Sequence, residues 1–135
     1  MALADNDAPV GRRLLKDFAL RLRGCDDEMR LRIVLHEFGL VWEDTPLVAR
    51  LRLVANEPGP VDARWDAFLA AYVEHRCMHE GITAPAWVYD DARDLDQFWF
   101  PGPDLDFFHV EAIVHCPAAF EARRVFLPAR ELLVV

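Results

Sequence analysis

Residues 61–81, VDARWDAFLAAYVEHRCMHEG, form the stretch that decides the fold. Asp62 can accept a hydrogen bond from a free amide of a first helical turn, and Gly81 stands where a left-handed residue would end the helix. At α-helical periodicity, one apolar stripe contains Trp65, Phe68, Leu69, Tyr72 and Val73. The stretch therefore predicts a long amphipathic helix at the centre of packing.

The last turns of this predicted helix place polar groups on its apolar face. Arg76 and His79 continue the face of Tyr72, and His75 lies beside Phe68. Positive groups suit the C-terminal end of a helix, so this turn can simply emerge into solvent. The alternative is a pocket lined by Tyr72, His75, Arg76 and His79 that binds a small molecule or a metal ion, with or without catalysis.

Around this helix, the patterns predict a mainly α protein with a compact helical domain over residues 11–135. Residues 1–10 are expected to form a flexible arm, and the stretch NEPGP at 56–60 marks a point where the domain can sub-divide. A short irregular or extended segment is expected near the C-terminus, where Pro128 interrupts an apolar run.

Three shorter helices are expected before residue 60. The first lies over 11–24, and the second ends at Gly39 because glycine commonly follows a helix. Residues 40–44 then form a connection, and Thr45 and Pro46 are typical of the N-cap and first residue of a third helix.

Residues 105–115 are ambiguous, because their apolar side chains alternate as in a strand but also fit a helix. Helix is favoured because the neighbouring segments are helical. Between 87 and 106 the chain concentrates aromatic and acidic residues. The aromatic residues either complete the core or form, with the aspartates, an exposed surface for a partner. That candidate partner-binding surface comprises Trp87, Trp99, Phe100, Asp94, Asp96, Asp104 and Asp106.

The charge distribution bounds the class of partner. The net charge is −8, and residues 1–60 are nearly neutral, with 9 basic and 10 acidic side chains. Residues 61–135 carry 6 basic and 13 acidic side chains, which makes nucleic acid an unfavourable partner for them. A basic protein partner fits this charge, and so does simple solubility.

Catalytic and metal-binding motifs are weakly represented. The chain contains no serine, which excludes a Ser-His-Asp triad, and its cysteines lack the paired spacing of zinc sites. His75 and His79 are four residues apart but need a distant third ligand to hold zinc. No catalytic residue, metal site or cofactor is therefore expected.

The three short helices also raise a DNA-binding alternative, because brief connections between helices are typical of a helix-turn-helix. The third helix offers Arg50 and Arg52 to bases and little else. The near-neutral charge of this part of the chain does not favour that alternative.

Four segments beyond residue 64 resemble a known group of proteins: WDAFLAAYVEH from Trp65, PAW from Pro85, LDQFWFP from Leu95 and PAAFEARRVFLPARELL from Pro117. They are similar to the region that follows a helix-turn-helix domain in bacterial regulators that act as the antitoxin side of toxin–antitoxin pairs. The resemblance is carried mainly by Trp65, Trp87, Trp99, Pro101, Phe120 and Phe126. It implies a non-enzymatic domain that binds a partner protein, although this chain lacks an evident DNA-binding head.

The leading expectation is thus a protein-interaction module, antitoxin-like or regulatory, that binds a partner through an acidic, aromatic-containing surface. No signal peptide and no apolar run of membrane-spanning length is found, which predicts a cytoplasmic protein.

Overall fold

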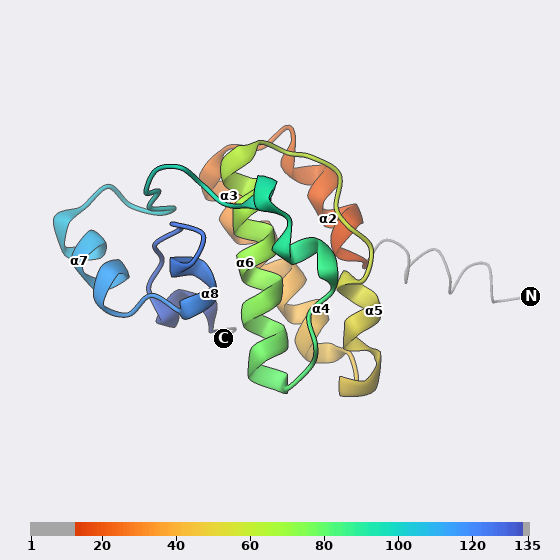
Figure 1. Ribbon diagram of the computed structural model, residues 1–135. Helices are drawn as coiled ribbons and strands as arrows, with labels where there is room; N and C mark the ends of the chain where they lie inside the picture. Colours follow the sequence, from red (N-terminus) through yellow and green to blue (C-terminus); the bar gives the residue numbers. More distant parts are fainter. Residues whose placement is uncertain (1–12, 134–135) are drawn as a thin grey trace, which may run out of the picture. The chain divides into compact units, whose positions relative to one another are not determined.

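The structure is a computed structural model that describes residues 13–133, so the arm expected at 1–10 lies outside the described residues. The chain divides into two compact units, which meet in sequence between Gly59 and Pro60. Both units are built from helices, which confirms the mainly α prediction (Figure 1). Over residues 13–133 the β structure is confined to an isolated bridge between Trp99 and Val125, and no helix there could cross a membrane.

Unit 1, which ends at Gly59, contains a short helix, a long helical run and a final short helix. The elements are α2 (Leu15–Leu22), α3 (Asp27–Leu31), η1 (Arg32–Phe38), α4 (Gly39–Asp44), η2 (Leu47–Ala49) and α5 (Arg50–Val54). Helix α2 packs against η1 and α5. The ring of Phe18 meets the ring of Phe38 edge-on at 5.3 Å, and the Arg30 side chain donates to the Leu22 carbonyl over 2.8 Å.

The second predicted helix does not end at Gly39. Gly39 has ordinary right-handed helical angles, and the helix continues through residues 40–44, which were expected to be a connection. The continuation buries Trp42 completely, and that burial outweighs the intrinsic cost of a glycine within a helix. The middle of the run, η1, has the wider π-helical winding, and it places the consecutive residues Ile33, Val34 and Leu35 in the core.

The predicted N-cap role of Thr45 is also wrong. The Thr45 hydroxyl donates to the Val41 carbonyl over 2.6 Å, so it completes the end of α4 instead of starting the next helix. Pro46 precedes a single 3₁₀ turn, and only then does α5 begin at Arg50.

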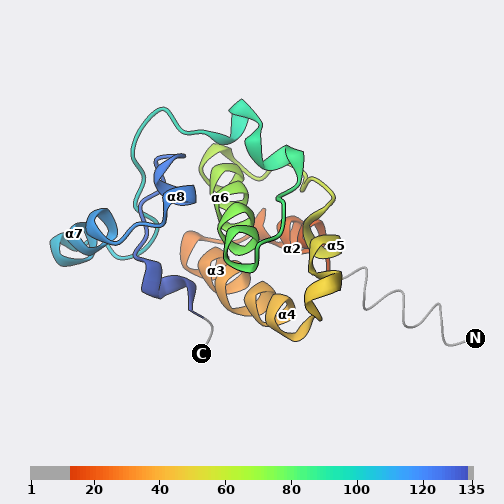
Figure 2. The same cartoon turned by 60° about the horizontal axis from the view of Figure 1, so that its bottom comes forward.

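Unit 2, which begins at Pro60, is organised around one long helix. Its elements are α6 (Ala63–Glu80), η3 (Ala86–Tyr89), η4 (Asp91–Arg93), α7 (Asp106–Val114), α8 (Ala118–Glu121) and η5 (Ala129–Leu132). Helix α6 packs against α8, η3 and η4. In both views α8 lies between α6 and α7, so α7 stands at the margin of this unit (Figures 1 and 2). The helical interpretation of 105–115 is confirmed, and the extended segment near the C-terminus lies over 125–128.

Both predicted caps of α6 are confirmed. The Asp62 carboxylate accepts from the Trp65 amide over 2.9 Å, and Gly81 ends the helix with a left-handed φ of 68°. The amphipathic expectation is only partly right, because every residue from 67 to 73 is buried, as is Cys77 on the expected outer side. Helix α6 is therefore enclosed, as befits the core element of a small domain.

Aromatic rings fill the space beside α6. Trp65 contacts Phe68 with centroids 4.7 Å apart, and Trp99 meets Trp65 edge-on at 5.3 Å. Phe120 of α8 meets Phe68 edge-on at 5.3 Å. These tilted and edge-to-face arrangements are the favourable ones for buried aromatic rings.

A buried arginine joins three parts of unit 2. The Arg123 guanidinium donates to Glu74 of α6 over 2.7 Å, to the Val88 carbonyl of η3 over 2.7 Å and to the Ala119 carbonyl of α8 over 2.8 Å. Its side chain is only 4% exposed and that of Glu74 only 17%. The tie is therefore a desolvated ion pair rather than a surface one, and each partner depends on the other.

We expect Arg123→Met to lower the free energy of unfolding by about 3–5 kcal/mol, because it leaves the Glu74 carboxylate without its buried counter-ion. Urea denaturation followed by circular dichroism measures this change. Arg64→Met, which removes an exposed guanidinium 5.6 Å from the Trp99 ring, is the matched control and should cost below about 1 kcal/mol. The double variant Glu74→Gln/Arg123→Met should cost less than the two single changes together, and strict additivity would contradict the coupling.

Candidate functional site

Helix α7 carries an apolar face that the rest of the described chain leaves open. Phe107, Val110, Ile113 and Val114 fall within one stripe of the helix, and each is between 57% and 77% exposed. We call these four residues the outer face of α7. On the opposite side, Phe108 and Ala112 are buried. An isolated exposed apolar side chain needs no explanation, but four neighbouring apolar side chains exposed on one helix face do.

The inner side of α7 is held by a close backbone approach. The Phe108 ring lies so near Gly102 that a Cβ at Gly102 would be 2.7 Å from Phe108 Cζ. Gly102 also has a φ of 128°, which L side chains rarely adopt. The PGP turn at 101–103 thus needs its glycine for two separate reasons, and it seats α7 through Phe108.

Polar and aromatic contacts fix the rest of α7. Glu111 pairs with Arg130 at the start of η5, and the His115 carbonyl accepts from the Ala129 amide over 2.9 Å. The His109 ring stacks on Phe100 with centroids 4.4 Å apart. The arginine holds the pKa of the Glu111 carboxyl below its usual range by hydrogen bonding to the ionised form. The helix is therefore presented in one orientation, with its apolar outer face free.

The acidic residues of the predicted surface separate into two pairs. Asp104 and Asp106 are exposed at the N-terminal end of α7, and Asp104 also lies 3.6 Å from the His109 ring nitrogen. Asp94 and Asp96 are exposed as well, but they follow η4, which packs against α6. Only the first pair adjoins the outer face of α7.

The aromatic residues of the predicted surface have three different environments. Trp99 is 6% exposed, and backbone bonds to Arg124 and Phe126 hold it in the core, where it has little surface to offer a partner. Trp87 is half-buried beneath the Arg93 guanidinium, which lies 4.6 Å from its ring. Phe100 is half-buried against α7. Between residues 87 and 107 the exposed aromatic side chains are instead Tyr89, Phe98 and Phe107, none of which belongs to the predicted surface.

The second predicted site, at the end of α6, is mostly internal. Arg76 is buried, and its Nε donates to the Tyr72 hydroxyl over 3.1 Å. The solvated last turn that charge preference suggested therefore begins only after Cys77, with Met78 and His79 exposed. His75 and His79 lie side by side, with ring centroids 4.5 Å apart. Within residues 13–133, no cluster of three or more His, Cys, Asp or Glu side chains is placed to hold a metal ion.

The titration of His75 reflects this environment. Burial, followed by the neighbouring His79 and Arg76, lowers the pKa of His75 from 6.5 to about 4. At neutral pH the His75 ring is therefore uncharged. Burial and the nearby Glu74 raise the pKa of the Cys77 thiol to about 11, so this thiol is a poor nucleophile.

The DNA-binding alternative loses one of its two arginines. The Arg50 guanidinium donates to the carbonyls of Thr45 and Glu43 and lies over the Trp42 ring, so it is engaged by its own unit. Arg52 remains exposed and lines a pocket of unit 1.

A search of protein family models, of curated proteins and of solved structures finds no match to this chain.

We expect acidification to destabilise the protein partly through His75. The folded state holds His75 neutral down to about pH 4, whereas the unfolded chain takes up the proton at an ordinary pKa of 6.5. Stability is therefore fully present above pH 6.5 and is lost as the pH falls towards 4. The His75→Gln variant should lose less stability than wild type between these pH values in urea denaturation. An NMR titration that places the His75 ring near pH 6.5 would contradict this account.

Proposed function

We propose that this chain is a non-enzymatic protein-interaction module, and that the outer face of α7 is its docking element. The observation that carries the proposal is the exposure of Phe107, Val110, Ile113 and Val114 on one helix whose inner side is anchored. Contiguous apolar surface of this kind costs solubility, and proteins retain it mainly where a partner covers it.

The spacing of the outer face suits insertion into a groove. Phe107, Val110 and Val114 are three and seven residues apart, the repeat with which helix anchors fill a hydrophobic groove of another protein. Phe107 is the natural main anchor, because large aromatic side chains contribute most when an interface buries them. Fixing α7 before binding, through Phe108 and the Glu111–Arg130 pair, reduces the entropy lost on association.

Charge narrows the kind of partner. Asp104 and Asp106 flank the outer face at the start of α7, and residues 61–135 carry a net charge of −7. We call Asp104 and Asp106 the acidic rim of the outer face. A partner whose groove is bordered by Lys or Arg is complementary to this acidic rim, and such complementarity mainly accelerates association and selects the partner. An antitoxin-like role, in which the partner is the toxin of the pair, is the form of this proposal that the resemblance in residues 65–133 supports.

The proposal predicts that a partner contacts Phe107 directly. A photo-reactive benzoylphenylalanine at position 107 should cross-link one protein in a native lysate in stoichiometric yield, and mass spectrometry of the product identifies it. The same probe at Val48, which is 96% exposed in unit 1, is the matched control and should give no such product. Cross-linking only to a second copy of this chain, or equally at both positions, would contradict the proposal.

With the partner identified, single substitutions test the face. Val110→Asp should weaken binding by about tenfold or more, since a charge in a desolvated apolar contact costs at least about 1.4 kcal/mol. Val48→Asp makes the same chemical change at another exposed valine and should leave affinity unchanged. Calorimetric titration measures both, and thermal unfolding should be nearly unaffected in each variant because both side chains are exposed. Equal affinities for the two variants would exclude α7 as the docking element.

The electrostatic part has its own test. Asp104→Asn/Asp106→Asn should slow association and flatten its dependence on salt concentration. Asp94→Asn/Asp96→Asn removes the same formal charge away from the start of α7 and should have the smaller effect. Stopped-flow association rates at several salt concentrations distinguish the pairs, and indistinguishable rates would remove the acidic rim from the proposal.

A further inference from the structure

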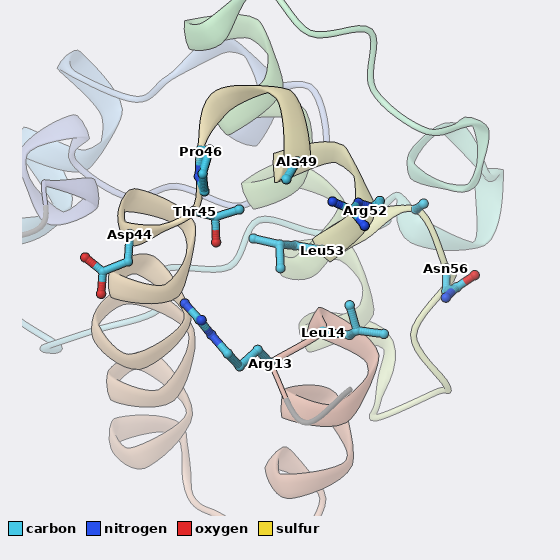
Figure 3. A pocket seen from close by; sticks show the side chains of 10 residues that line it. Arg13, Leu14, Asp44, Thr45, Pro46, Ala49, Arg52, Leu53 and Asn56 are labelled. Carbon is cyan, nitrogen blue, oxygen red and sulfur yellow. The ribbon is translucent and has the colours of Figure 1, made fainter. Parts of the chain in front are cut away.

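Unit 1 contains a pocket that the proposed function does not use. It encloses about 500 Å³ between the start of α2, the end of α4 and α5 (Figure 3). This volume lies in the range of about 300–1,000 Å³ that is usual for small-molecule sites. The residues that line it are Arg13, Leu14, Asp44, Thr45, Pro46, Ala49, Arg52, Leu53, Ala55 and Asn56.

Half of this lining is apolar. Leu14 and Leu53 face the interior of the pocket from opposite sides (Figure 3). The Leu53 side chain is only 7% exposed, so the packing of unit 1 fixes its position. Pro46, Ala49 and Ala55 complete the apolar walls. A ligand that fills this space therefore needs an apolar body.

Two arginines supply the polar contacts. Among residues 13–133, no hydrogen bond or ion pair engages the guanidinium of Arg13 or of Arg52. Arg52 points from α5 into the pocket, and Arg13 extends across it from the start of α2 towards α4 (Figure 3). Arg50, by contrast, is bound to the Thr45 and Glu43 carbonyls and holds the turn that forms one wall. Arg50 therefore has a structural role in the pocket wall, whereas the guanidinium groups of Arg13 and Arg52 are available to a ligand.

The charges select an anion with a single negative charge. The Asp44 carboxylate points away from the middle of the pocket, and the Thr45 hydroxyl already donates to Val41. With Arg13 and Arg52 against Asp44, the lining has a net formal charge of +1. A carboxylate accepts two parallel hydrogen bonds from a guanidinium and carries this one charge, whereas a phosphate brings more charge than the lining neutralises.

We propose that this pocket of unit 1 binds a small carboxylic acid with an apolar body, its carboxylate held by Arg13 and Arg52 and its body against Leu14 and Leu53. This ligand site is separate from the outer face of α7, and the proposal does not depend on the proposed protein interaction. The Thr45 hydroxyl is engaged by the Val41 carbonyl and the Asp44 carboxylate points away from the ligand space, so binding rather than turnover is the assigned activity.

The test uses octanoate as the probe and methyl NMR of the whole chain as the readout. Octanoate should shift the Leu14 and Leu53 methyl resonances in a saturable way, while octylammonium, with the same chain and the opposite charge, and inorganic phosphate, with no apolar body, should not. Arg52→Gln should lower the affinity for octanoate about tenfold or more, because it removes a charge-assisted hydrogen bond to the carboxylate. Arg32→Gln, at an exposed arginine of η1, is the matched control and should bind as wild type.

A second variant separates pocket filling from charge. Ala49→Phe places a ring in the cavity and leaves both arginines in place, so it should abolish the octanoate shifts while the remaining spectrum is preserved. Absence of saturable shifts at Leu53, equal binding of octanoate and octylammonium, or full affinity in Arg52→Gln would each overturn the proposal. Failure of the cross-link at Phe107 would leave this result untouched, because the two sites share no residue.

Discussion

The ion pair between Arg123 and Glu74 is the constraint on which unit 2 depends. One guanidinium, itself buried, satisfies a carboxylate on α6, a carbonyl on η3 and a carbonyl on α8. A buried ion pair is a poor source of net stability, but it penalises arrangements in which either partner is left alone. The ion pair therefore fixes the position along α6 at which η3 and α8 pack. The aromatic rings of Trp65, Phe68 and Phe120 then fill the space that this packing defines.

Local signals in the sequence were sufficient for α6 and insufficient for the helices of unit 1. Asp62 and Gly81 act within one turn of the helix they delimit, so their roles follow from the residues alone. Gly39 and Thr45 carry the same kind of signal, yet Gly39 lies inside a helix and Thr45 completes one. Trp42 decides the difference, because its complete burial requires α4 to continue past the glycine. Such a preference is tertiary, and no window of neighbouring residues contains it.

The candidate partner-binding surface was also predictable only in part from local sequence. Composition located an acidic and aromatic region between 87 and 106 but could not say which side chains face outward. Trp99 is in the core and Phe107 is outside, although each stands in a similar apolar context along the chain. What separates them is the bridge between Trp99 and Val125, which joins residues distant in sequence, and the packing of the Phe108 ring on Gly102, which fixes the side of α7 that faces inward. The pocket of unit 1 was likewise beyond sequence reasoning, since its lining combines the start of α2 with the end of α4 and α5.

The attachment of α7 has a thermodynamic consequence. This helix is fastened by a few groups: the Phe108 and Ala112 side chains, the stacking of His109 on Phe100, and the Glu111–Arg130 pair. Few buried contacts mean that α7 can detach at a lower free energy than the whole unit unfolds. A ligand that recognises only the attached form is opposed by the detached population, and its apparent affinity falls in proportion to the attached fraction. The free energy that holds α7 on its own chain therefore sets the apparent affinity for the partner. Substitutions that no partner touches can raise or lower that affinity by changing the attached fraction.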